Sequence, residues 1–189
     1  MPMISAITID KREVALISLM AGLALVTNYA LISVPNVKLM DLIVFAVGFS
    51  LGPVKGALMG VLIWVVYGTL NPYGFSLPIW LSTMVGESIY GVVGGLRGKR
   101  GFRLGGRREY LLRSLEMAFW AFLTTLIYDL LTNVVFALTF GIPVIQALLA
   151  GTPFMMLHQA GNIVSFFTLA IPVIQAINKA LSLGPRNLR

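Results

Sequence analysis

The chain contains no cysteine and a single histidine, and only 11% of its 189 residues are charged. The lack of cysteine excludes disulfides, thiolate metal sites and a cysteine nucleophile. One histidine cannot form an HExxH zinc motif, and no GxxxxGKS or GxxxxGKT stretch is present to hold nucleotide phosphates. We therefore expect a protein that is not an enzyme, uses no cofactor and binds no metal ion.

Charge is scarce because apolar residues are abundant. Hydrophobic residues make up 58% of the chain and the mean hydropathy is +0.89, more than a soluble domain of this size needs. The apolar runs are continuous, without the two-residue alternation of a membrane β-barrel. Roughly 20 helical residues cross about 30 Å of hydrocarbon. We predict an all-α membrane protein, a single domain over residues 1–189, with six transmembrane helices over residues 14–34, 36–52, 54–70, 77–96, 115–140 and 146–176.

The fourteen lysine and arginine residues are distributed unevenly along the chain. Seven fall in residues 97–113, and most others lie at the start of the chain, at Lys55 and in the tail. If six helices alternate in direction, these positions share one side of the membrane, which the positive-inside rule makes cytoplasmic. We therefore expect a prokaryotic cell-membrane protein with a cytoplasmic N-terminus (1–12), a basic cytoplasmic loop (97–113) and a cytoplasmic tail (178–189). Without interleaved aromatics or a binding fold, the basic residues indicate topology and lipid contact, and no nucleic-acid partner.

The segment from residue 36 to residue 52 is unusual because it is short. Its seventeen residues make about 25 Å of helix, and Asp41 falls inside it. The segment either crosses a locally thin membrane, with Asp41 near the surface or sheltered by protein, or does not cross as a full helix. Glycines recur every four residues from Gly48 to Gly60, and Gly91 and Gly95 repeat this spacing. Such spacing predicts close packing of the second and third segments.

Polar side chains inside apolar segments are the best indicators of function, because a carboxylate at the centre of a span costs roughly 2.5–3.5 kcal/mol. Tyrosine and tryptophan also anchor helices at the membrane boundary, and an amide or histidine also bonds neighbouring helices. Most of the embedded polarity lies from the midplane outward, which indicates a cavity open to the exterior. The candidate substrate-binding residues are Asn28, Asn36, Tyr67, Trp80, Glu87, Asp129, Asn133, His158, Gln159 and Asn162.

The stretch PNVKLMDLIVFAVGFSLGPVKGALMG, residues 35–60, resembles the substrate-binding (S) components of energy-coupling factor transporters. The likeness covers nearly the whole chain: six helices, cytoplasmic termini, a glycine-rich junction between helices two and three, and a basic loop after helix four. It implies capture of a vitamin or related micronutrient in an outward-facing cavity formed by helices four to six and the external loops. It also implies partners: a membrane-embedded coupling protein and two ATPase subunits. These partners supply the energy, because this chain has no nucleotide-binding motif of its own.

The resemblance also assigns roles to particular positions. Residues after helix one would form a gate over the cavity. Many family members carry an Ala-xxx-Ala pattern in helix one, on the face that meets the coupling protein, and this sequence offers a comparable stripe of small residues instead. The gate residues are Pro35, Asn36 and Lys38, and the coupling residues are Ala15, Ser18 and Gly22.

The sequence leaves the substrate and two other functions open. Aromatic faces, amides and two acids suit a planar, polar and even cationic molecule, such as a vitamin, a cobalamin-like compound or a modified nucleobase. A stand-alone permease that works without ATPases is the main alternative. A membrane enzyme or a lipid-binding protein is the other.

Overall fold

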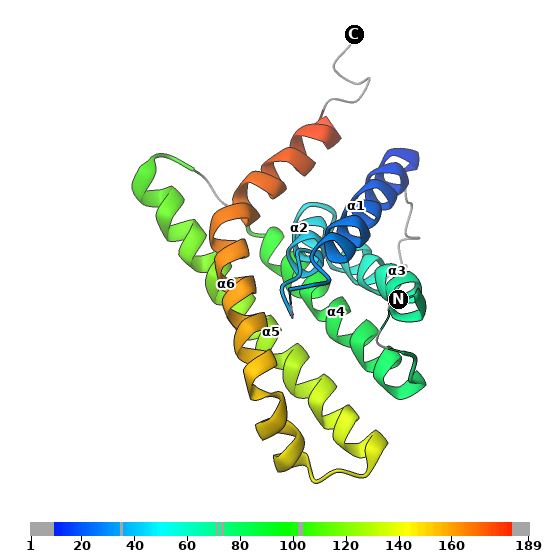
Figure 1. Ribbon diagram of the computed structural model, residues 1–189. Coiled ribbons are helices and arrows are strands. Elements are labelled where there is room, and N and C mark those ends of the chain that lie inside the picture. The colour runs from blue at the N-terminus through cyan, green and yellow to red at the C-terminus, as the bar shows by residue number, and fades with distance from the viewer. Residues whose placement is uncertain (1–9, 35, 71, 73, 102–103, 183–189) are drawn as a thin grey trace, which may run out of the picture.

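The computed structural model describes residues 10–34, 36–70, 72, 74–101 and 104–182, and helices dominate this part of the chain (Figure 1). Six helices follow one another, and no strand occurs among these residues. The predicted all-α class is therefore confirmed. The helices are α1 (Lys11–Ala30), α2 (Met40–Leu51), α3 (Pro53–Leu70), α4 (Leu77–Gly98), α5 (Arg107–Phe140) and α6 (Val144–Ser182).

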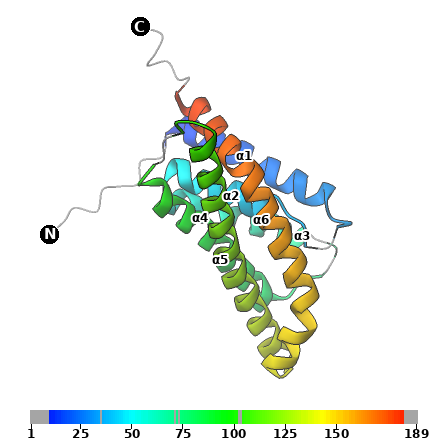
Figure 2. The ribbon, with the colours of Figure 1, turned by 90° about the vertical axis from the view of Figure 1, so that its left-hand side faces the viewer.

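Four of the helices, α1, α3, α5 and α6, are long and apolar enough to cross a membrane, so the chain is a membrane protein. The 34 residues of α5 and 39 of α6 make about 51 and 58 Å of helix, beyond a hydrocarbon thickness of about 30 Å. These two helices lie side by side and cross obliquely (Figures 1 and 2). Helix α4 packs against α5, α2 and α1 contact α6, and α3 packs on α4, α2 and α1. Large apolar side chains stay exposed on their outer surfaces, as expected for contact with lipid.

The second segment forms a short helix enclosed by the others. Helix α2 has 12 residues, or about 18 Å, and every residue from Met40 to Gly48 is buried. It begins at Met40, later than the predicted start at residue 36. Asn36 has a left-handed backbone with φ of +54°, a conformation that no α-helix continues. The enclosure by protein explains how so short a segment, with Asp41 in its first turn, is accommodated in a membrane protein.

The predicted glycine packing is present and joins three helices instead of two. A Cβ atom added at Gly56 of α3 would lie 2.6 Å from the Cα of Gly48 in α2 and 2.8 Å from the Cα of Gly91 in α4. Further along α4, Gly95 abuts the backbone of Pro53. Because the three backbones touch, their mutual positions are fixed by contacts that tolerate no side chain.

The basic segment 97–113 is mostly helical, not a loop as predicted. Helix α4 continues to Gly98, and α5 begins at Arg107. Arg97 binds Glu116 through two guanidinium nitrogens, and Arg113 Nη1 lies 2.9 Å from the same carboxylate. These ion pairs join the end of α4 to the first part of α5. Helix α6 also continues further than predicted, to Ser182, past the predicted start of the tail at residue 178.

The two ends of the bundle differ in the helix ends and connections that lie there. The start of α1, the α4–α5 connection and the end of α6 lie at one end, at the top of Figure 1. At this end Lys55 Nζ lies 2.6 Å from Glu13 Oε1, which joins the starts of α3 and α1. The α3–α4 and α5–α6 connections lie at the other end. We call these the basic end and the far end.

Candidate ligand-binding pocket

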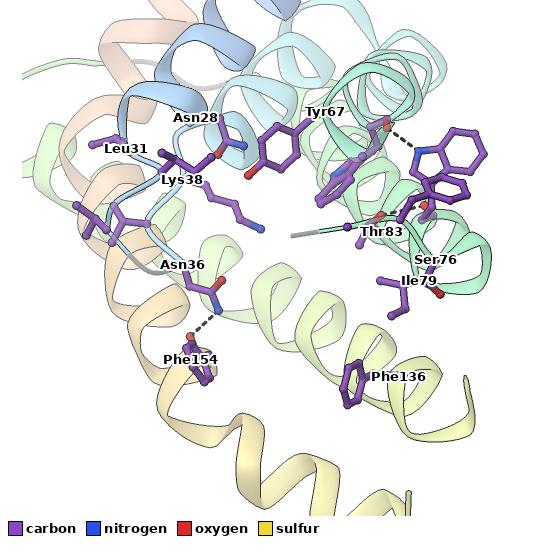
Figure 3. A pocket seen from close by; sticks show the side chains of 18 of the residues that line it. Asn28, Leu31, Asn36, Lys38, Tyr67, Ser76, Ile79, Thr83, Phe136 and Phe154 are labelled. Carbon is purple, nitrogen blue, oxygen red and sulfur yellow. Dashed lines mark hydrogen bonds between the residues drawn. The ribbon is translucent and has the colours of Figure 1, made fainter. Parts of the chain in front are cut away.

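A pocket of about 640 Å³ is lined by residues from the loop after α1, the connection before α4 and the ends of α5 and α6 near the far end of the bundle. It lies between the end of α1, the loop of residues 31–39, the second half of α3, the first half of α4 and parts of α5 and α6 (Figure 3). This volume falls within the range of ordinary small-molecule sites, about 300–1,000 Å³. The side chains that line it are mainly apolar and aromatic, with a few polar groups.

One wall of the pocket is aromatic and rigid. The indole nitrogen of Trp80 donates a 2.8 Å hydrogen bond to the carbonyl of Trp64. The ring of Trp64 packs edge-on against that of Tyr67, with 5.4 Å between the ring centres. The ring centres of Phe75 and Trp80 are 5.6 Å apart. Gly68 permits this arrangement, because a Cβ at that position would overlap the indole of Trp80. Aromatic side chains held in this way present a flat surface against which a planar ligand stacks.

The loop of residues 31–39 covers a second side of the pocket. Asn36 lines the cavity and donates a 3.0 Å hydrogen bond from Nδ2 to the carbonyl of Phe154 in α6. Figure 3 shows this bond joining the loop to the helix at one side of the pocket. Of the three predicted gate residues, Asn36 and Lys38 line the pocket, and Pro35 lies outside the described residues.

Lys38 is the only charged side chain among the described residues that line the pocket. Its Nζ lies 5.5 Å from the ring centre of Trp64 and 5.4 Å from that of Tyr128. Both distances are within the range of cation–π attraction. The two rings therefore hold the ammonium group in a defined position at the inner edge of the cavity.

Behind the pocket, a network of buried polar side chains connects α2, α5 and α6. His158 Nε2 lies 2.7 Å from Asp41 Oδ2, and His158 Nδ1 lies 2.7 Å from Asp129 Oδ1. All three residues are at most 4% exposed. Each contact is a hydrogen bond only if a proton lies between its two atoms, so the three side chains together must carry two protons. Either the ring is an imidazolium between two carboxylates, or it is neutral and one of the two acids is protonated.

Asn162 extends this network to α4. Its Nδ2 lies 2.7 Å from Asp41 Oδ2 and 2.8 Å from Thr125 Oγ1, and the Tyr90 hydroxyl donates a 2.8 Å hydrogen bond to the same threonine. Asp41 therefore receives contacts from two residues one turn apart on α6. Such contacts fix the short α2 helix between its neighbours.

Glu87 connects this interior to the pocket wall. Its Oε2 accepts a 3.2 Å hydrogen bond from the indole nitrogen of Trp64, whose ring lines the cavity. Glu87 itself is fully buried, and its carboxyl group also lies against that of Asp41 in the buried network. The carboxylate thus supports the aromatic wall from behind and does not reach the cavity.

The predicted site residues divide into three groups. Asn28, Asn36, Tyr67 and Trp80 line the pocket. The buried network contains Glu87, Asp129, His158 and Asn162. Two lie in neither place and bond to backbone carbonyls: Asn133 to that of Asp129, and Gln159 to that of Phe122.

Sequence reasoning missed several residues of this region. It left open whether Asp41 lies near the membrane surface or is sheltered by protein, and it did not single out Trp64, Tyr90 or Thr125. It also passed over residues 48–52, GFSLG, which match the GxSxG pattern of hydrolase nucleophiles. That pattern acts at a strand-to-helix turn, whereas Ser50 lies in the last turn of α2. The only histidine is bound to Asp41 and Asp129, so the motif forms no catalytic triad.

The proposed coupling residues lie on the outside of the bundle. Ala15, Ser18 and Gly22 are all exposed along α1, and no atom approaches within 4 Å of a Cβ added at Gly22. Spacings of three and four residues place them on one face of the helix. This face is available for contact with lipid or with another protein.

Comparison with known proteins adds no assignment, because no protein family, curated protein or solved structure matches the chain. Within the described ranges, no group of three or more acidic or histidine side chains is arranged to hold a metal ion. A functional assignment therefore depends on the pocket, its lining and the surrounding helices.

Proposed function

We propose that the protein is the substrate-capture (S) subunit of an energy-coupling factor type importer in the prokaryotic cell membrane. The observation that supports this most directly is the 640 Å³ pocket, enclosed by helix ends and covered by the loop of residues 31–39. A pocket at one end of a helical membrane protein, in a sequence without a nucleotide-binding motif, suits a subunit that binds a ligand while partners supply energy.

The proposal includes a definite orientation. Six segments alternate, both termini are cytoplasmic, and α2 crosses as a short helix sheltered by its neighbours. The basic end then faces the cytoplasm and the pocket faces outward. The concentration of arginine and lysine at the basic end favours this orientation.

In the proposed cycle, a vitamin or related micronutrient enters the pocket from outside and stacks against the aromatic wall. The loop of residues 31–39 closes over it, held to α6 by the Asn36 hydrogen bond. The exposed small-residue face of α1 then docks on the membrane-embedded coupling protein, which is driven by two ATPase subunits. Close approach of helices in lipid favours small side chains of this kind.

The first experiment is mass spectrometry of small molecules released from the purified protein, with a mock purification as control. A single enriched micronutrient-like compound is expected. Its uptake is then measured in cells that contain this protein with or without a coupling protein and two ATPases. Uptake that needs these partners supports the proposal. Uptake without them favours a stand-alone permease, and recovery of lipid alone favours a lipid-binding protein.

A further inference from the structure

We propose that the pocket recognises an anionic group, a carboxylate or phosphate, on an otherwise planar and largely apolar ligand. This inference rests on the proposed capture function and names the charge of the captured molecule. The group that carries it is the Lys38 ammonium, the only charged side chain among the described residues that line the pocket. It reverses the expectation from the sequence, where two embedded acids suited a cation.

The first observation is an unsatisfied donor. Asn28 lines the pocket and is only 3% exposed, yet its Nδ2 has no hydrogen-bond partner among the described residues. A buried amide donor without a partner costs about 1–3 kcal/mol. This nitrogen is itself covered by the pocket wall, so it contributes to binding only where a ligand acceptor displaces that cover, and the Lys38 charge carries the inference.

The second observation is the Lys38 ammonium group. Figure 3 shows Lys38 extending into the pocket beside Asn28 and Tyr67. No ion pair involves Lys38 in the part of the chain that the structure describes. Asp41 is three residues away, but its Oδ2 faces His158 and Asn162. The buried carboxylates of Asp41 and Glu87 attract the Lys38 ammonium group without forming an ion pair with it. Its charge also faces the cavity, where low polarity strengthens its attraction for an anion.

The third observation is the beginning of α4 at the pocket wall. Ser76 precedes the helix, lines the pocket, and makes no capping hydrogen bond with its side chain. Pro78 at the second helical position has no N–H, so the N–H groups of Leu77 and Ile79 and the positive end of the α4 dipole lie at this wall. Helix N-termini bind anions for this reason.

Negative charge is absent from the described lining. Asp41, Glu87 and Asp129 all lie in the buried network and none of them lines the pocket. A cation in the pocket would face Lys38 without a carboxylate to compensate. The remaining walls, including Phe136, Phe154 and the Trp80 indole, suit the planar body of the ligand.

The test uses three probes with one ring and three charges: nicotinate, nicotinamide and the N-methylnicotinamide cation. Binding to the full chain is measured by equilibrium dialysis in nanodiscs of neutral phosphatidylcholine, so that no anionic lipid headgroup competes. We expect nicotinate to bind about tenfold more tightly than either of the others, the effect of one charge-assisted hydrogen bond. Repeating the measurement with phosphatidylglycerol present shows whether a lipid headgroup competes for the same group.

Substitutions of Lys38 assign the preference to this residue. Lys38→Met should abolish it while Lys38→Arg preserves it, and Lys179→Met, a change to an exposed lysine at the basic end, should leave it intact. Equal or tighter binding of the amide or the cation overturns the inference, as does the absence of nicotinate binding. Loss of the charge preference with a neutral compound recovered from the purified protein would overturn the inference while leaving the capture function in place.

Discussion

At the scale of single residues, the position of His158 distinguishes a structural role from a ligand-binding one. The sequence suggested a ligand contact, but the ring lies between two carboxylates on other helices and does not line the pocket. A buried charged or polar group whose partner is removed is costly to the fold. We therefore assign His158 primarily to the packing of α2 against α5 and α6.

The variant His158→Leu tests this assignment. It leaves Asp41 and Asp129 facing an apolar side chain, and we expect the free energy of unfolding to fall by about 3–5 kcal/mol. Thermal unfolding in detergent measures the change. Gln159→Leu is the matched control, because that neighbour is only partly buried and makes one bond to a backbone carbonyl. Normal stability in His158→Leu together with lost ligand binding would return His158 to the binding site.

Asn36 combines two features that can be separated by substitution. Its left-handed backbone is accessible to glycine without strain but costs alanine about 1–2 kcal/mol. Both Asn36→Gly and Asn36→Ala remove the hydrogen bond to the Phe154 carbonyl. If that bond holds the loop closed, both variants release ligand faster, and only the alanine variant also loses stability. Stopped-flow tryptophan fluorescence with the co-purified compound measures release, and a wild-type rate in both variants would exclude a gating role.

At the scale of elements, the glycine contacts determine how α2, α3 and α4 pack. A Cβ at Gly91 would overlap the backbone of Gly56 and Ala57, so Gly91→Ala forces the helices apart. We expect a loss of about 1–3 kcal/mol in stability, as for other overpacked interiors. Gly22→Ala is the control: it has open space around it on α1 and should be neutral or stabilise the helix by up to about 1 kcal/mol. Equal melting temperatures for the two variants would contradict this account of the packing.

The exposed face of α1 carries the proposed coupling contact. Ser18→Leu combined with Gly22→Leu adds bulk to that face without a clash inside the chain. We expect ligand binding to be unchanged and partner-dependent uptake to fall at least several-fold, since close helix contact needs small residues. Val164→Leu with Thr168→Leu, an exposed pair at the same spacing on α6, serves as control. Unchanged uptake in the α1 variant would show that coupling uses another surface.

The helices could largely be located from the sequence, but their ends could not. The apolar part of α3 was predicted to within a residue, because Gly52 and the turn after Leu70 interrupt it on both sides. The start of α5 was missed by eight residues, since arginine and glutamate are good helix formers but carry no hydropathy signal. The start of α2 depended on the backbone of Asn36, which no periodicity reveals.

At the scale of the whole molecule, the site was predicted only in part. The sequence identified buried polar residues correctly as exceptional, since lipid penalises them wherever they face. Which of them face a cavity depends on how α2, α5 and α6 are rotated about their own axes. That rotation cannot be predicted from a single sequence. His158 and Asn36 illustrate the difference: both were candidates, yet only Asn36 reaches the pocket.

The proposed orientation in the membrane is tested by labelling, which the absence of native cysteine makes simple. Ser33→Cys places a thiol in the exposed loop near the pocket, and Lys99→Cys places one at the end of α4. In intact cells an impermeant maleimide should label only the first, and permeabilisation should expose the second. Labelling of both in intact cells would rule out the alternating topology, and the reverse pattern would invert it.

The location of Lys38 has a consequence for the covalent chemistry of this protein. The chain has five lysines. Lys11 begins α1, Lys55 pairs with Glu13, Lys99 ends α4 and Lys179 lies in the last turn of α6, all at the basic end. An acylating reagent with a planar body that enters from the far end therefore meets a single lysine side chain, inside the cavity. The Lys38 amine is thus a natural attachment site for selective covalent inhibitors and for reporters of pocket occupancy.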